Sequence, residues 1–494
     1  MFSNPFIPLA AACPKHAWRW SAAAAVLLLA GCASLSPEGD SASVAELAQP
    51  RLAAFGSVSS VSLHARLTPE AQARVSALLQ APLTDQAAVQ IALIHSPAAH
   101  AALARLGVSD ADRVLASTWP APHLSLGVLR EGDTREIERG FSFNLLGLLT
   151  LPWQARVQAQ QHEILRLQTA QELVQLASRT RKAWVNAVAA EQSARYMADA
   201  LEAAQASAEL ARRMVKAGNW SQMQHTREQL QLAEVQAQLK RVQHLAVVER
   251  ETLTRFLGLE AAQASYTLPS RLPDLPKTVG EKGAEGEAQA RALRERLDVR
   301  SALARTQQLA DSAALEPWQT WARGMELGLV HNSTLDRSTG SKLTKNGWEL
   351  TLPLPIAGSD ARQARAEALL REAAARLRET SVVAASEVRQ SWSAYASAHA
   401  LARQYRDEVL PLRQSMSEEV LQRYNGMFLS VFDVLTDARA QIAVVNAAML
   451  AERDFWLAKT DLDTTLSGAS PAGLSALQGA LPNTPKTSNE HGGH

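Results

Sequence analysis

Few side chains in this sequence have the type and spacing of a reactive site. The phosphate-binding pattern G-x-x-x-x-G-K-[ST], the zinc pattern H-E-x-x-H and the nucleophile pattern G-x-S-x-G do not occur in its 494 residues. Two cysteines supply neither a disulfide framework nor a four-ligand zinc site. His225 stands alone, and the end Glu490–His494 could hold a metal only weakly. We therefore expect a protein that is not an enzyme and needs no cofactor.

The composition excludes further classes of protein. Lys and Arg number 50 against 49 Asp and Glu, so the chain lacks the basic excess that nucleic-acid binding needs. Aromatic residues, at 5%, are too sparse for a large all-β protein. Average glycine and proline usage argues against collagen-like or wholly disordered chains. The composition thus favours a mainly helical fold.

Cys32 has the clearest chemical role. Basic residues precede an apolar run over 22–30, which is the pattern of a secretory signal. The run ends in Leu29-Ala30-Gly31-Cys32, which is similar to the lipobox of bacterial lipoproteins, whose cysteine is acylated. We expect a lipoprotein signal peptide over 1–31 and a lipidated Cys32, whose acyl chains would anchor the protein. The resemblance to Gram-negative lipoproteins implies that Ala33, at the next position, favours sorting to the outer membrane. The alternative is an ordinary signal with an incidental cysteine.

Four segments alternate apolar and polar residues with a period of two, which predicts strands. They lie at 123–130, 141–145, 325–329 and 348–354, and we expect polar loops over 130–139 and 331–346. Their length suits transmembrane strands, and no later run of 18 uncharged apolar residues predicts a transmembrane helix. The alternative is two soluble hairpins packed on helices.

Four strands cannot close a membrane barrel by themselves. The smallest membrane barrels need about eight strands. Copies of the chain must therefore pool their strands, and this argument leaves both two and three copies open.

The longest predicted elements are helices. Residues 153–217 contain neither proline nor glycine, and such a rod spans on the order of 100 Å. We expect a second rod over 359–424. The segments that return from each rod keep a 3-4 apolar spacing typical of coiled coils: Leu232, Val235, Leu239 and Val242, and Leu435, Ala438, Ile442 and Val445. Rods with a seam and charged faces suit the wall of a water-filled tube.

The chain repeats one plan. Ala101–Arg105 is nearly repeated as Ser301–Arg305, and the same order of short helix, two strands, long helix, turn and helix follows each copy. We expect an extended N-terminal lead over 32–85, a first repeat over 86–259, a linker over 260–291, a second repeat over 292–468 and a disordered tail over 469–494.

Two turns join the long helices. The first contains Gly218, Asn219 and Ser221, and the second contains Tyr424, Gly426 and Ser430. Glycine at a helix end and serine as the next cap are sufficient to explain Gly218, Ser221, Gly426 and Ser430.

The order of these features resembles one family. A lipoprotein signal, duplicated strand–strand–helix–turn–helix halves, an Ala-Gly-Asn-x-Ser turn, a Tyr-x-Gly…Ser-x-x-Asp-Val-Leu turn and the stretch Arg296–Arg300 all resemble the TolC-like outer membrane efflux family, over about residues 86–468. The resemblance implies a mainly α fold with a small transmembrane β portion. Three protomers would form a twelve-stranded barrel above an α-barrel of long antiparallel coiled-coil hairpins.

The resemblance also implies a function. The expected homotrimer is the exit duct of a tripartite efflux pump, and its helical tips dock a periplasmic membrane-fusion (adaptor) protein that couples it to an inner-membrane pump. The rival hypothesis is a lipid-anchored periplasmic coiled-coil scaffold or adaptor that does not cross the membrane. Drugs, metal ions such as copper, and proteins all remain open as cargo.

Two carboxylates are candidates for a pore constriction, because family tips often carry acidic residues. Asp433 matches the turn motif, and Asp437 lies one helical turn later, whereas Thr436 holds the family's second acidic position. A ring of carboxylates from three copies would favour cations. The alternative for Asp433 is a helix N-terminal carboxylate stabilised by the helix dipole.

Overall fold

The computed structural model describes residues 35–36, 40–56, 67–260, 265–277, 284–322, 325–352 and 358–471. The chain divides into two compact units, one from 1–36, 111–155 and 321–353 and the other from 37–110, 156–320 and 354–494. The expected signal over 1–31, the lipidated Cys32 and most of the expected tail lie outside the described residues.

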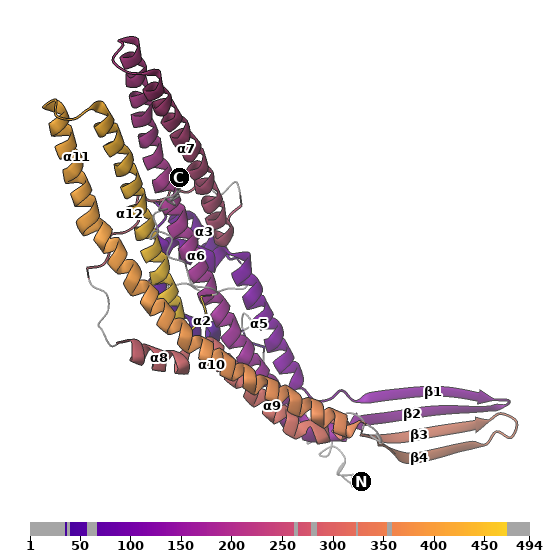
Figure 1. Ribbon diagram of the computed structural model, residues 1–494. Coiled ribbons are helices and arrows are strands. Elements are labelled where there is room, and N and C mark those ends of the chain that lie inside the picture. Colours follow the sequence, from indigo (N-terminus) through magenta and orange to yellow (C-terminus); the bar gives the residue numbers. More distant parts are fainter. Residues whose placement is uncertain are drawn as a thin grey trace, which may run out of the picture. The chain divides into compact units, whose positions relative to one another are not determined.

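The first unit contains a four-stranded antiparallel sheet in the order β1-β2-β3-β4 (Figure 1). The strands are β1 (His123–Glu131), β2 (Thr134–Asn144), β3 (Glu326–Asp336) and β4 (Lys342–Thr351). The four expected strands are present, but their bounds differ: β2 and β4 begin earlier than expected, at Thr134 and Lys342, and Leu145 belongs to the helix that follows β2. Because β2 pairs with β3, the sheet joins one hairpin from each repeat. β1 and β4 form its two edges.

The expected polar loops over 130–139 and 331–346 are wrong. β1 and β2 pair down to Glu131 and Thr134, which leaves only Gly132 and Asp133 in the turn. β3 and β4 likewise pair as far as Leu335 and Lys342. The ladder is made by backbone groups, so charged side chains at its end do not interrupt it, although they remove the apolar alternation.

Two helical hairpins make up most of the second unit. α6 (Leu145–Lys216) returns as α7 (Gln222–Leu257), and α10 (Ser359–Gln404) with α11 (Leu410–Asn425) returns as α12 (Val431–Leu466). The first expected rod is confirmed, and α6 begins before it because Asn144 Oδ1 accepts the Gly147 N–H at 2.6 Å and caps the helix.

The second expected rod is not one α-helix. A π-helical turn, η4 (Tyr405–Val409), separates α10 from α11, and Pro411 is the second residue of α11. Pro411 has no N–H to donate to the carbonyl of Asp407, four residues earlier, and the proline ring crowds that carbonyl. A π-turn accommodates this local loss of the α-helical ladder.

The expected extended lead over 32–85 is wrong, because this segment contains helices α2 (Ser41–Leu52) and α3 (Pro69–Leu78) with η2 (Ala53–Phe55). Val44, Ala48 and Leu52 keep a helical spacing and are buried, but the run is too short to stand out in the sequence. Further helices are α4 (Asp85–His95), α5 (Pro97–Ala116), α8 (Ala284–Glu295) and α9 (Leu297–Ala322). α8 therefore occupies the end of the expected linker.

The largest hydrophobic core of the second unit surrounds α4 and the middle of α6. Val89, Ile91 and Leu93 of α4 are almost completely buried with Trp184 of α6. The Trp184 indole N–H donates to the Leu83 carbonyl at 2.7 Å, so the buried ring keeps its hydrogen bond. This core fixes the N-terminal helices against the first long hairpin.

Buried ion pairs tie the first repeat to the second. Arg181 of α6 contacts Asp463 of α12 at 3.2 Å and Asp85 of α4 at 3.1 Å, and the neighbouring Lys182 pairs with Asp461. Charges removed from water must be paired, so these contacts fix the register between α6 and α12.

One helix could cross a membrane by length and composition alone. Within the described residues, an apolar window of α12 reaches a mean hydropathy of 1.2, and 17% of that window is buried. α4 and α5 together also pass this test, with a 45° bend between them. Seven of the apolar residues of α12 are alanines, which allow another helix to approach closely, so its exposed surface equally suits contact with a helix.

Arg296 is a testable anchor of the second repeat. Its fully buried guanidinium contacts Asp298 at 2.6 Å and Glu387 of α10 at 2.7 Å. We predict that Arg296→Ala lowers the free energy of unfolding by about 3–5 kcal/mol, because two carboxylates lose their partner in a poorly hydrated site. Denaturant titration of the detergent-solubilised protein measures this loss.

Arg376→Ala is the matched control. Arg376 is 73% exposed and pairs with Glu372 one helical turn earlier on α10. Its removal should change the unfolding free energy by less than about 0.5 kcal/mol. Equal effects of the two substitutions would contradict the anchoring role of Arg296.

Candidate functional site

One face of the sheet is apolar and exposed. The register places Leu124, Phe141, Leu329 and Trp348 in one row across all four strands. Their side chains are 71%, 45%, 59% and 72% exposed. A continuous apolar patch of this kind marks a surface that meets an apolar environment.

The opposite face is polar. A groove on it is lined by Ser125, Glu138, Ser142, Glu326 and Glu349, among others. Glycines let the strands carry these groups, since a Cβ on Gly140 would lie 2.3 Å from the Ser125 hydroxyl oxygen. The sheet thus has the two chemically different faces of a wall between an apolar and an aqueous phase.

The first helical turn has the expected chemistry. Gly218 has a φ of 74°, which glycine adopts without strain, and the Asn219 N–H donates to the Met214 carbonyl at 3.0 Å. Ser221 and Gln224 form a capping box, with the Ser221 N–H donating to Gln224 Oε1 at 2.7 Å. The expected roles of Gly218 and Ser221 in the turn are confirmed.

The second turn differs from the expectation at Gly426. Gly426 has a φ of −79°, and the left-handed residue is Met427, with a φ of 63°. The Met427 N–H donates to the Tyr424 carbonyl at 2.9 Å, which closes the helix. A Cβ at 426 would lie 2.9 Å from the ring of Phe428, so a larger residue there would have to displace this exposed side chain.

Asp433 forms a capping box with Ser430. Its Oδ2 accepts the Ser430 N–H at 2.8 Å and the Ser430 hydroxyl at 2.7 Å. The Ser430 hydroxyl and N–H lower the pKa of this exposed carboxyl below its usual value. The carboxylate therefore serves at least as the helix cap that the alternative interpretation describes.

Asp437 is buried and paired. Its Oδ1 lies 2.5 Å from the Arg413 guanidinium of α11, and that guanidinium also bonds the Asp437 carbonyl. In one copy of the chain this carboxylate thus joins α11 to α12, and its charge is neutralised by Arg413.

Two contacts between the helical hairpins carry no signal in the sequence. Trp220, in the first turn, stacks on Phe432 at the start of α12, with ring centroids 4.5 Å apart. Glu228 of α7 is almost fully buried and lies 2.5 Å from the Arg439 guanidinium of α12. Both contacts depend on the fold bringing together residues about 210 positions apart. They link the ends of the two hairpins.

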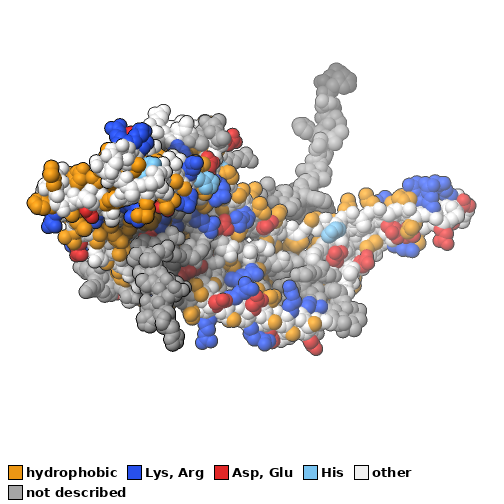
Figure 2. Space-filling view, turned by 45° about the horizontal axis from the view of Figure 1, so that its top comes forward, with side chains coloured by type: hydrophobic (Ala, Val, Ile, Leu, Met, Phe, Trp, Pro, Cys, Tyr) orange, Lys and Arg blue, Asp and Glu red, His pale blue; other side chains and the backbone are white. Residues whose placement is uncertain are grey.

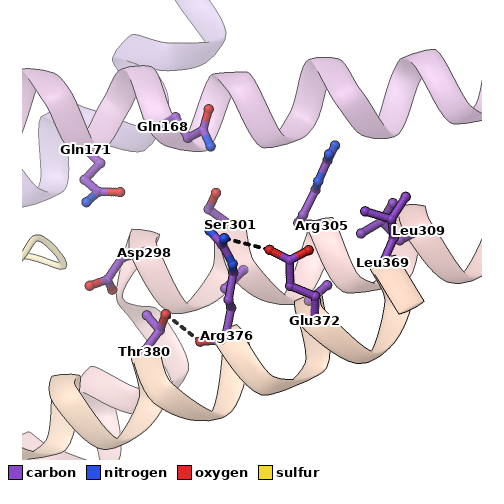
Figure 3. A pocket seen from close by; sticks show the side chains of 12 residues that line it. Gln168, Gln171, Asp298, Ser301, Arg305, Leu309, Leu369, Glu372, Arg376 and Thr380 are labelled. Atoms are coloured by element: carbon purple, nitrogen blue, oxygen red, sulfur yellow. Dashed lines mark hydrogen bonds and ion pairs between the residues drawn. The ribbon is translucent and has the colours of Figure 1, made fainter. Parts of the chain in front are cut away.

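An open cleft lies between α6, α9 and α10 (Figure 3). Charged groups in this cleft bond residues of their own helix: Glu372 pairs with Arg376 at 2.6 Å, and Arg305 donates to Gln308 at 2.7 Å. Polar groups do not converge on one point of this cleft. No group of three or more His, Cys, Asp or Glu able to hold a metal occurs within the described segments.

Known proteins resemble this chain in structure but not detectably in sequence. No family model matches the sequence, and no curated protein matches it. Solved structures do match. The outer membrane protein VceC of Vibrio cholerae is 17% identical, with a TM-score of 0.62 over 78% of this chain and 96% of VceC.

Two outer membrane channels give similar values. CmeC of Campylobacter jejuni is 14% identical, with a TM-score of 0.61 over 82% of this chain and 87% of CmeC. MtrE of Neisseria gonorrhoeae, in its open state, is 14% identical, with a TM-score of 0.61 over 78% of this chain and 90% of MtrE. The expected fold class is confirmed: this chain has the mainly helical fold, with a small four-stranded sheet, of outer membrane channels such as CmeC and MtrE.

Proposed function

We propose that this chain is the outer-membrane exit channel of a tripartite efflux pump and works as a homotrimer. The observation that carries the proposal is the sheet, which has an exposed apolar face, a polar face and two open edges. Open edges are not tolerated in hydrocarbon, so the sheet needs copies of itself on both sides. Three copies pool twelve strands, which is enough to close a barrel.

The helices supply the rest of the proposed duct. α6 has 72 residues and spans on the order of 100 Å. The two turns at residues 216–221 and 425–430 then form the end that docks a periplasmic adaptor, which connects the channel to an inner-membrane pump. The exposed Met427 and Phe428 give this end apolar contact area. Lipidated Cys32 adds an anchor in the outer membrane.

The alternatives fit the same observations less well. A periplasmic scaffold has no use for Leu124, Leu329 and Trp348 on one exposed sheet face. An enzyme needs converging reactive groups, and the open cleft between α6, α9 and α10 lacks them. The proposed protein moves cargo passively, and its partner pump supplies the energy.

Neighbouring residues on β3 give a direct test. Leu329 lies on the apolar face and Val330 on the polar face. Leu329→Arg places a charge in hydrocarbon, which costs about 2–4 kcal/mol per copy near the bilayer centre, whereas Val330→Arg places it in water. We expect Leu329→Arg to lose most of the heat-resistant trimer recovered from outer membranes and Val330→Arg to retain it. Similar recovery of both variants would refute the proposal.

The proposed constriction has its own test. A ring of Asp433 carboxylates would narrow and charge the pore, so Asp433→Ala should raise single-channel conductance in planar bilayers. Asp433→Asn is the control for the cap, because its oxygen can still accept bonds from Ser430 while the charge is removed. Asp437→Ala should act indirectly, by freeing Arg413. Unchanged current in both Asp433 variants would mean that Asp433 only caps the helix.

A further inference from the structure

The sheet separates positive from negative charge between its two faces. The register places Arg130, Arg135, Arg139 and Lys342 on the apolar face, which carries no carboxylate in any described strand. The opposite face carries one lysine, Lys345, and all the strand carboxylates: Glu131, Glu136, Glu138, Glu326, Asp336 and Glu349. Figure 2 shows Lys and Arg side chains gathered at the far end of the sheet.

Three of these cations form one row beside the hairpin turns. Arg130 on β1 lies directly opposite Arg135 on β2. Leu335 on β3 is the next residue in the row, between Arg135 and Lys342 of β4. Like charges directly opposite each other destabilise a strand pair. The Arg135 Nε is buried without a hydrogen-bond partner. Within the described part of the chain, none of the three cations forms an ion pair.

A second copy of the chain cannot supply the missing anion from its strands. Strands pooled into one barrel present the same face outward, and on this face the described strands have no Asp or Glu. The described strands therefore supply no counter-charge on this face, so this row can bind an anion from outside the protein.

The position of the row indicates where this anion lies. The row is six residues along β1 from the apolar row of Leu124, or about 20 Å at 3.3 Å per residue. With the apolar row in hydrocarbon, tilted strands place Arg130, Arg135 and Lys342 at the level of the lipid head groups. Arg139 lies only two residues from the apolar row, and its long side chain has to extend toward the same level. β1 and β4 are three strand spacings apart, about 14 Å.

We propose that Arg130, Arg135 and Lys342 form a binding site for the phosphate groups of lipopolysaccharide in the outer leaflet. This inference rests on the proposed function, which places the hairpin turns at the outer surface. Guanidinium groups bind phosphate through paired N–H donors, and Lys342 adds a point charge further along the row. A disaccharide head group with a phosphate at each end matches a row of this width better than a single phosphate does.

The experiment measures binding of purified lipopolysaccharide to the full-length protein in detergent. The triple variant Arg130→Gln, Arg135→Gln and Lys342→Gln should bind at least 10-fold more weakly than the unaltered protein. The matched control changes the opposite face, through Glu131→Gln, Glu136→Gln and Lys345→Gln, and should bind as the unaltered protein does. Dephosphorylated lipopolysaccharide should bind the unaltered protein at least 10-fold more weakly than the intact glycolipid.

Three results would overturn the site. These are equal binding by the triple variant, equal binding of the dephosphorylated form, and equal competition by phosphatidylglycerol or inorganic phosphate. Trimer mass and conductance are measured on the same samples. If the unaltered protein forms no conducting trimer, the proposed function is refuted. If it forms a conducting trimer but the triple variant binds lipopolysaccharide equally well, only this site is refuted.

Discussion

The unpaired backbone groups along β1 and β4 are the constraint on which the rest of this structure depends. A four-stranded sheet with one apolar face is poorly suited to water, and its open edges are poorly suited to hydrocarbon. Pairing β1 of one copy with β4 of the next satisfies the backbone groups at the edges. The closed sheet can then place its apolar face in hydrocarbon. The proposed trimer therefore follows from hydrogen bonding as much as from the burial of apolar surface.

The long helices of the second unit are held in register by contacts between the two repeats. Arg181 and Lys182 pair with Asp463 and Asp461, which fixes α6 against α12 near the core of the second unit. At the tips, the Trp220–Phe432 stack and the Glu228–Arg439 pair connect the same two hairpins again. Contacts near the core and at the tips therefore hold the hairpins of the two repeats side by side.

Periodic patterns predicted the strands and the long helices, because each buries a stripe or a face along its whole length. Prediction failed where the deciding interaction was local or distant in sequence. Pro411 produces a π-turn inside an otherwise regular helix, and Met427 takes the left-handed conformation expected of Gly426. The partner of Asp437 is Arg413, and no spacing rule could have paired them before α11 and α12 were placed side by side.

The central claim is that copies of this chain share their strands to complete one barrel. Light scattering of the detergent-solubilised Cys32→Ala variant measures the number of copies without the contribution of the lipid anchor. The account predicts a particle of three chains that still requires detergent. A water-soluble single chain would contradict it.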